Sequence, residues 1–190
     1  SEIDDFCSKQ CKNINWKASN SWTKKFIELE KQIHNFIQNE KIFTEANIAR
    51  TCLETLKSND QFIIGNSMPI RNVDMFCPSR TTSINTYSNR GASGIDGIVS
   101  TALGISMHSN NNALLLIGDL SFYHDMNGLL ATKNNINLTI VVINNHGGGI
   151  FSYLPIAKQN IKSFKEFWTT NIDLDIKTVA NLYQCKYDKC

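Results

Sequence analysis

The stretch ALLLIGDLSFYHDMNGLLATKNNINLTIVVINNHGGG, residues 113–149, decides the fold class. It holds two continuous apolar runs, at 113–118 and 138–143, with a segment of helical character between them. Continuous apolar strands that alternate with helices are typical of a parallel sheet covered on both faces. The stretch therefore predicts an α/β fold. Each run ends in a polar pair, Gly118-Asp119 and Asn144-Asn145.

The same pattern extends towards the N-terminus. The run QFII at 61–64 precedes Gly-Asn-Ser, and INTY at 84–87 precedes Ser-Asn-Arg-Gly and a Gly-rich turn. We predict a helix after that turn, with Ile95, Val99 and neighbouring apolar residues facing inward. Residues 60–190 are thus predicted to form a doubly wound parallel sheet with helices on both faces, preceded by a helical segment.

The first 59 residues have a different character. Residues 1–20 are polar and are expected to be irregular, whereas apolar residues from Trp22 to Ile37 recur at helical spacing. Thr44 is a candidate N-cap for a second helix. We interpret 1–59 as the tail of a preceding domain together with a first packing helix, and 60–190 as the α/β domain. Because the chain begins with Ser and stops abruptly, we expect it to be part of a longer protein.

Composition excludes some functional classes. The net charge is only +2, with charged residues at 19%, so nothing indicates binding to nucleic acid or to an anionic membrane. No apolar run approaches the length of about 20 residues that a membrane-spanning helix needs. The six cysteines are dispersed and are expected to be free thiols of a protein inside the cell.

The polar pairs at the strand ends suggest a metal site. In open α/β sheets, ligands collect beyond the carboxyl ends of the strands, where Asp119 and Asn145 are expected to lie. Mg²⁺ takes hard oxygen ligands, usually one or two carboxylates together with phosphate oxygens. Asp119, the Asn145 amide oxygen and a carbonyl near Gly147 could hold such an ion, and backbone amides at Leu120 and Ser121 could meet a phosphate.

A simpler interpretation stays open for each pair taken alone. Gly-Asp is common where a strand ends, and Asn-Asn is common in β-turns. An α/β module that binds a nucleotide or a partner without catalysis is a further alternative, because a fold does not guarantee a function. The presence of both pairs at consecutive strand ends makes the metal interpretation more specific.

The spacing of these pairs resembles the signature of thiamine-diphosphate enzymes, although Leu120 stands where Gly or Ala is usual. The sequence also resembles one branch of that family, the 2-succinyl-5-enolpyruvyl-6-hydroxy-3-cyclohexene-1-carboxylate synthases of menaquinone and phylloquinone biosynthesis. Three longer segments carry this resemblance: SNRGASGIDGIVSTALG, GDLSFYHDMNGL and VVINNHGGGIFSYLP. The resemblance is strong over residues 60–157 and weak on either side. It implies that 1–59 are the end of a middle domain with a linker and packing helices, and that 60–190 are a diphosphate-binding domain truncated at its C-terminus. Another carboligase or decarboxylase of the acetolactate synthase type is a lower-ranked alternative.

The resemblance implies a role for particular residues. Metal ligands would be Asp119, Asn145 and the Gly147 carbonyl. Cofactor-binding residues would be Ser67, Ile95, Gly118, Asp119, Leu120, Ser121 and Asn145, with Ile95 supporting the bent conformation of the cofactor. Substrate-binding residues would be Asn66, Arg71, Arg90 and Phe151, with the two arginines meeting carboxylates. Gly149 replaces a polar residue of some relatives, and His146 receives no role.

The resemblance also implies a reaction and an assembly. Thiamine diphosphate and Mg²⁺, or Mn²⁺, would serve decarboxylation of 2-oxoglutarate and 1,4-addition of the resulting succinyl carbanion equivalent to isochorismate. The glutamate that activates the cofactor would come from an N-terminal domain outside this sequence, so we expect no catalytic residue here and no activity from this chain alone. Active sites would lie between subunits of a homodimer or homotetramer. The sequence of the motif at 143–155, INNHGGGIFSYLP, slightly favours a plastid stroma over a bacterial cytoplasm.

Overall fold

The protein is described by a computed structural model that covers residues 2–13, 20–40, 42–134, 136–159 and 161–190. It divides into two compact units, Ser1–Glu40 and Lys41–Cys190. The helix that begins at Glu45 therefore belongs to the same unit as the sheet. The predicted boundary after residue 59 had placed this helix in the preceding segment.

The described residues of the first unit form two helices, α1 (Glu2–Asn13) and α2 (Asn20–Asn39). Helix α2 covers the predicted stripe from Trp22 to Ile37. The expectation that residues 1–20 are irregular is wrong for α1, whose polar sequence carries three acidic residues in its first turn, where they interact favourably with the helix dipole. Neither helix contains a buried residue.

The second unit alternates strands with helices. Its elements in chain order are α3 (Glu45–Thr55), β1 (Gln61–Ile64), α4 (Met68–Phe76), β2 (Asn85–Tyr87), α5 (Ile98–Met107), β3 (Ala113–Gly118), α6 (Asp119–Asp125), the 3-10 helix η1 (Met126–Asn134), β4 (Leu138–Ile143), the 3-10 helices η2 (Gly149–Tyr153) and η3 (Pro155–Gln159), the π-helix η4 (Lys165–Thr169) and α7 (Ile176–Leu182).

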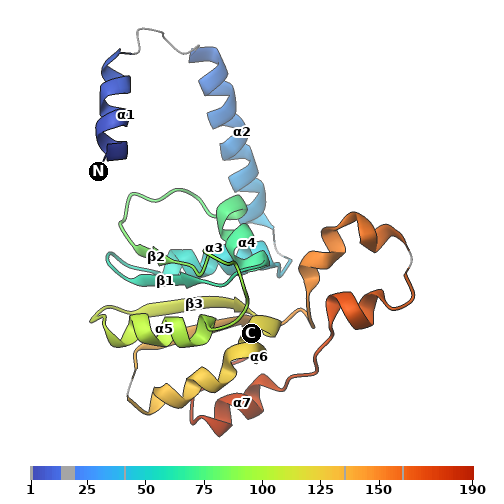
Figure 1. The fold of residues 1–190 in the computed structure, drawn as a ribbon. Helices are drawn as coiled ribbons and strands as arrows, with labels where there is room; N and C mark the ends of the chain where they lie inside the picture. The colour runs from blue at the N-terminus through green and yellow to red at the C-terminus, as the bar shows by residue number, and fades with distance from the viewer. Residues whose placement is uncertain (1, 14–19, 41, 135, 160) are drawn as a thin grey trace. The chain divides into compact units, whose positions relative to one another are not determined.

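The four strands form one parallel sheet in the order β2-β1-β3-β4. Strand β1 is followed by β2 on one side, and the chain then crosses to β3 on the other side (Figure 1). In doubly wound sheets this change of direction marks the place where ligands bind. All four carboxyl ends lie on one edge because every pairing is parallel. The predicted doubly wound α/β fold is confirmed.

Two hydrophobic clusters show that the sheet is covered on both faces. Alternate residues of the central strands divide between them: Phe62 and Leu116 face one cluster, whereas Ile63 and Leu115 face the other. Residues of α3 complete the first cluster, and residues of α5, α6, η1 and α7 complete the second. In the ribbon, α3 and α5 lie on opposite sides of the sheet (Figure 1). The side-chain period of two in a strand produces this division. The central strands are therefore rigid supports for the loops at their ends.

Helix boundaries agree with the expected signals in one case and differ in another. Thr44 caps α3, with its hydroxyl accepting a hydrogen bond from the Asn47 amide at 3.2 Å. Helix α5 begins only at Ile98, after Gly97 in a left-handed conformation (φ 65°). Ile95 therefore lies in the preceding loop and is 36% exposed, so its predicted place on the inward face of a helix is wrong.

In the parts of the chain that the structure describes, no helix combines the length with the apolar character that crossing a membrane requires. The six cysteines are free thiols.

The central strand β3 provides a test of the packing. Leu115 has no exposed surface, so Leu115→Ala would leave a cavity and should lower the free energy of unfolding by about 3 kcal/mol. Leu130→Ala is a matched control, because this leucine is 60% exposed and should change stability by less than about 0.5 kcal/mol. Urea unfolding measures both. Equal effects of the two substitutions would contradict the described core.

Candidate functional site

The carboxyl ends of β3 and β4 bring the two predicted motifs together. Gly118, the last residue of β3, pairs in register with Ile143, the last residue of β4. Asp119 therefore starts α6 beside the turn that begins at Asn144. This arrangement follows from the two apolar runs, because equal strand lengths in a parallel pair end at the same level.

Asp119 is the most buried ionisable side chain of the site, with 2% of its surface exposed. Its Oδ2 accepts a hydrogen bond from the Gly147 backbone amide at 2.8 Å, and its Oδ1 accepts one from the Leu120 amide at 2.7 Å. Burial raises the pKa of Asp119 above its ordinary value, and hydrogen bonds from backbone amides partly oppose the shift. Among the described residues, no lysine or arginine forms an ion pair with this carboxylate.

The turn after β4 requires glycine. Gly147 has φ 129°, a backbone conformation that residues with a Cβ rarely adopt, and a Cβ here would overlap the Thr169 carbonyl oxygen. The next amide, of Gly148, donates to the same carbonyl at 2.6 Å. His146 also has a positive φ of 62°. The turn thus packs tightly against the segment at Thr169, and the Gly147 amide points at Asp119.

Asn145 lies on the exposed side of this turn. Its Nδ2 donates a hydrogen bond to Oε1 of Glu45 at 2.9 Å. Glu45 lies 100 positions earlier in the chain. The amide oxygen is the opposite arm of the same planar group, so it points away from Glu45. Sequence reasoning missed Glu45, which gave only the signal of a helix start.

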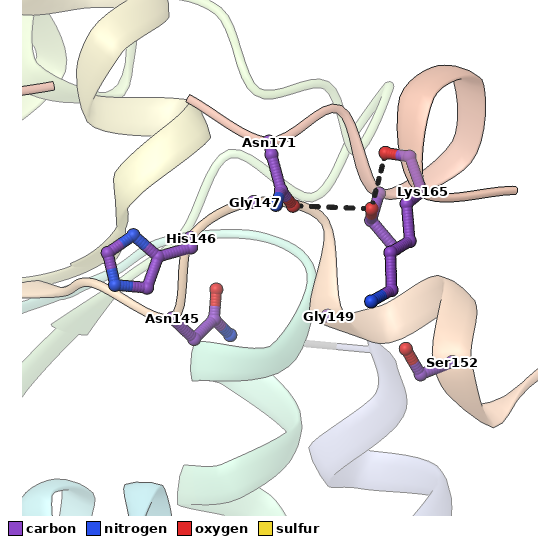
Figure 2. Close-up of a pocket in the computed structure, with 8 residues that line it drawn as sticks. Asn145, His146, Gly147, Gly149, Ser152, Lys165 and Asn171 are labelled. Carbon is purple, nitrogen blue, oxygen red and sulfur yellow. Dashed lines mark hydrogen bonds between the residues drawn. The ribbon is translucent and has the colours of Figure 1, made fainter. Parts of the chain in front are cut away.

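A pocket of about 180 Å³ opens beside the turn (Figure 2). Its lining residues are Asn145, His146, Gly147, Gly149, Ser152, Lys165, Thr169 and Asn171. This volume is below the roughly 300 Å³ of the smaller pockets that enclose whole ligands, so it suits one polar end of a ligand. The Lys165 side chain extends from η4 towards Gly149 and Ser152 (Figure 2). No motif indicated Lys165 or Asn171, because their segment has no glycine or strand pattern.

The other predicted site residues lie at the ends of β1 and β2. Asn66 is 2% exposed, and its Nδ2 donates to the carbonyls of Asn89 at 2.9 Å and Gly94 at 2.5 Å. Arg90 Nη1 lies 3.5 Å from Asn66 Oδ1. Asn66 thus holds the loop that carries Arg90, and its predicted contact with substrate stays a prediction.

Ser67 and Arg71 are joined at the start of α4. Ser67 adopts φ 71° and ψ −127°, a strained conformation for a residue with a side chain, and such strain is concentrated at functional sites. Arg71 Nη1 donates to the Ser67 carbonyl at 2.6 Å.

Phe151 packs edge-on against Trp168, with ring centroids 5.9 Å apart. Ser121 is buried at 3% exposure in α6. The assigned roles of these residues stay predictions.

The donor set suits a hard cation that also receives oxygens from its ligand. Asp119 offers a carboxylate whose oxygens each keep a lone pair after accepting one hydrogen bond. Buried charges are normally paired or bound to metals, and among the described residues the hydrogen-bond donors to this carboxylate are backbone amides. Within the described ranges, no group of three or more His, Cys, Asp or Glu side chains could hold an ion by itself. The residues therefore fit Mg²⁺ with phosphate oxygens better than a protein-only metal cage.

The glycine requirement at the turn can be tested directly. Gly147→Ala would force a positive φ on alanine and push its Cβ into the Thr169 carbonyl, so the turn must move away from Asp119. We expect a loss of stability of about 1–3 kcal/mol in urea unfolding. Gly104→Ala is the control, because its added Cβ meets nothing within 4 Å and α5 should gain or keep stability. An unaffected Gly147→Ala protein would contradict the described turn.

The raised pKa of Asp119 has a defined effect on stability. Between the unfolded and folded pKa values, the folded protein keeps a proton that the unfolded chain has lost, so stability falls as pH rises. Asp119→Asn cannot titrate. In metal-free buffer we expect this variant to gain stability relative to the wild type as pH rises above about 4, the ordinary carboxyl pKa. Urea unfolding at several pH values measures the difference, and a difference that stays constant would contradict the raised pKa.

Comparisons with known proteins agree with this geometry. The chain is 45% identical over 172 residues to the 2-succinyl-5-enolpyruvyl-6-hydroxy-3-cyclohexene-1-carboxylate synthases of Staphylococcus aureus strains MSSA476 and MRSA252. These matches cover 89% of this chain and 30% of each relative, so the chain spans about 30% of their length. Both relatives are bacterial, and the weak preference for a plastid gains no support from them.

A solved structure shares the fold. Benzoylformate decarboxylase from Polynucleobacter necessarius superposes with a TM-score of 0.62 at 18% identity, over 80% of this chain and 29% of that chain. At this identity the likeness concerns the fold alone.

The family model described as "Thiamine pyrophosphate enzyme, C-terminal TPP binding domain" matches residues 74–189, more than half of the sequence. The chain therefore belongs to the thiamine pyrophosphate enzyme family, in its C-terminal domain.

Proposed function

We propose that this chain forms the diphosphate- and metal-binding part of a thiamine-diphosphate-dependent enzyme of the 2-succinyl-5-enolpyruvyl-6-hydroxy-3-cyclohexene-1-carboxylate synthase type. The observation that carries the proposal is Asp119, a buried carboxylate with no ion-pair partner among the described residues, held by backbone amides at the carboxyl edge of a doubly wound sheet. The relatives' names, the family match and this site all support the same cofactor.

In this proposal, the ends of β3 and β4 hold the charged end of the cofactor. Asp119, the Asn145 amide oxygen and the Gly147 carbonyl bind Mg²⁺ or Mn²⁺, and the diphosphate supplies further oxygens. Backbone amides in the first turn of α6, at Leu120 and Ser121, meet the diphosphate, and Gly118 allows its close approach. Ser67 and Ile95 contact the remainder of the cofactor from the β1 end and from the loop before α5.

The arginines at the other strand ends provide substrate recognition. Arg71 and Arg90 each use one guanidinium nitrogen in the structure and keep further N–H donors for a carboxylate. 2-Oxoglutarate and isochorismate each carry two carboxylates, so a pair of arginines matches their charge. Asn66 supports Arg90 and could contact substrate, and Phe151 forms part of an apolar wall.

The proposed reaction is decarboxylation of 2-oxoglutarate followed by 1,4-addition of the remaining carbon unit to isochorismate, as in menaquinone and phylloquinone biosynthesis. When bound, thiamine diphosphate supplies the nucleophilic carbon and the electron sink for this chemistry. The chain's own residues orient the reactants and exclude water. The activating glutamate comes from outside these residues, in a homodimer or homotetramer whose active sites lie between subunits. This chain alone is then inactive.

Calorimetry on the intact protein tests the proposal. We expect thiamine diphosphate to bind in the presence of Mg²⁺, and Asp119→Ala to abolish binding, because the substitution removes the only carboxylate of the proposed ligand set. Asp188→Ala changes the same charge at an exposed position near the C-terminus and should bind as the wild type does.

The alternatives predict other outcomes of calorimetry and of product analysis on the full-length protein. Tight binding of a dinucleotide without thiamine diphosphate would indicate a non-catalytic α/β module and would contradict the proposal. Conversion of pyruvate, but not of 2-oxoglutarate with isochorismate, would indicate an enzyme of the acetolactate synthase type. Product analysis by mass spectrometry distinguishes these two substrate classes.

A further inference from the structure

Three polar side chains connect the candidate metal site to helices α3 and α4. Glu45, in the first turn of α3, accepts hydrogen bonds on both carboxylate oxygens. Asn145 Nδ2 donates to Oε1 at 2.9 Å, and Asn72 Nδ2, from α4, donates to Oε2 at 2.9 Å. The carboxylate thus bridges α4 and the turn after β4.

The bridge determines which way each asparagine amide is turned. A carboxylate offers only acceptors, so the arm of Asn145 that faces Glu45 must be the NH₂ group. A half-turn of the Asn145 amide would place its oxygen against a carboxylate oxygen, which is repulsive. The Asn145 oxygen is therefore held on the side away from Glu45.

The bridge is itself well anchored. Asn72 is 2% exposed and fixes the second oxygen of Glu45 from the interior of the unit. The backbone of Glu45 is held by the Thr44 cap, and α3 packs on the sheet through Leu53 and other apolar residues. Asn145, by contrast, is on an exposed turn, where an unsupported amide would rotate between orientations. Glu45 removes that freedom before any ligand binds, which lowers the entropic cost of binding.

We propose that Glu45 is a positioning residue that presents the Asn145 amide oxygen to the bound cation, with Asn72 as its support. This inference rests on the proposed function, since it needs Asn145 to be a metal ligand. Groups that hold a ligand by hydrogen bonding from behind set its orientation, and their loss costs about 10–100-fold in metal affinity. Glu45 touches neither substrate nor cofactor in this role.

The test is the metal affinity of Glu45→Gln in the intact protein at saturating thiamine diphosphate. Glutamine has the size of glutamate, but one of its two arms is a donor, so it cannot accept from Asn145 and Asn72 in the same way. We expect the Mg²⁺ concentration for half-saturation to rise about 10-fold. The electron paramagnetic resonance signal of Mn²⁺, used in place of Mg²⁺, reports bound metal independently of activity.

Two controls separate positioning from a general structural effect. Glu54→Gln makes the same charge change at an exposed position of α3 and should leave metal affinity unchanged. Adding Asn72→Asp to Glu45→Gln restores an acceptor for the glutamine NH₂ group, which frees the glutamine oxygen for Asn145. We expect this double variant to recover most of the lost metal affinity. Without ligands, Glu54→Gln should melt as the wild type does, whereas Glu45→Gln weakens a hydrogen bond to the buried Asn72 and should melt at a slightly lower temperature. The recovery of metal affinity in the double variant therefore decides between positioning and a general structural effect.

Each other outcome overturns the inference. Wild-type metal affinity in Glu45→Gln shows that Asn145 needs no such support. A lower melting temperature of Glu45→Gln without ligands, with no recovery of affinity in the double variant, shows that the bridge only stabilises the fold. If the wild type itself fails to bind Mg²⁺ with thiamine diphosphate, the proposed function falls as well. Wild-type binding that Glu45→Gln does not weaken leaves the proposed function intact and removes only the role of Glu45.

Discussion

The hydrogen bond from the Gly147 amide to the Asp119 carboxylate joins the ends of two adjacent strands, and the rest of the site depends on it. It exists because β3 and β4 end in register, so that Asp119 and the turn after β4 leave the sheet at the same level. The bond also requires Gly147, whose φ of 129° turns its amide inward. A buried carboxylate is costly unless it has partners. Backbone amides meet part of that cost here, and the carboxylate remains able to attract a cation.

The sheet makes this geometry rigid. Its two central strands are buried along almost their whole length, and their alternate side chains supply two separate hydrophobic clusters. A close-packed core restricts the motion of its strands, including the residues at their ends. The loops beyond those ends can therefore hold strained residues, such as Ser67 with φ 71°, because the surrounding packing determines their conformation.

The fold could be read from the sequence, because continuous apolar runs and the glycines after them depend on local pattern alone. The meeting of Asp119 with the Gly147 turn followed from the parallel order of those runs. The Glu45 bridge could not be predicted, since it links residues 100 positions apart through one side-chain contact. The position of Ile95 was mistaken because Gly97, in a left-handed conformation, starts the helix later than the apolar spacing indicated. Lys165 was missed because its segment carries no pattern of either regular period.

The charge of the proposed metal ligands determines whether metal and cofactor bind together or separately. Under the proposed function, the chain offers one carboxylate, one amide oxygen and one carbonyl, which together carry a single negative charge. Mg²⁺ prefers six oxygens and gives up its water reluctantly, so three ligands of this kind bind it weakly. A diphosphate brings several negative oxygens to the same ion, and the ion in turn offsets the repulsion between the diphosphate and Asp119. Metal and cofactor would then bind together rather than in independent steps. Pre-orientation of Asn145 matters most in such a site, because each of the few protein ligands contributes a large share of the binding.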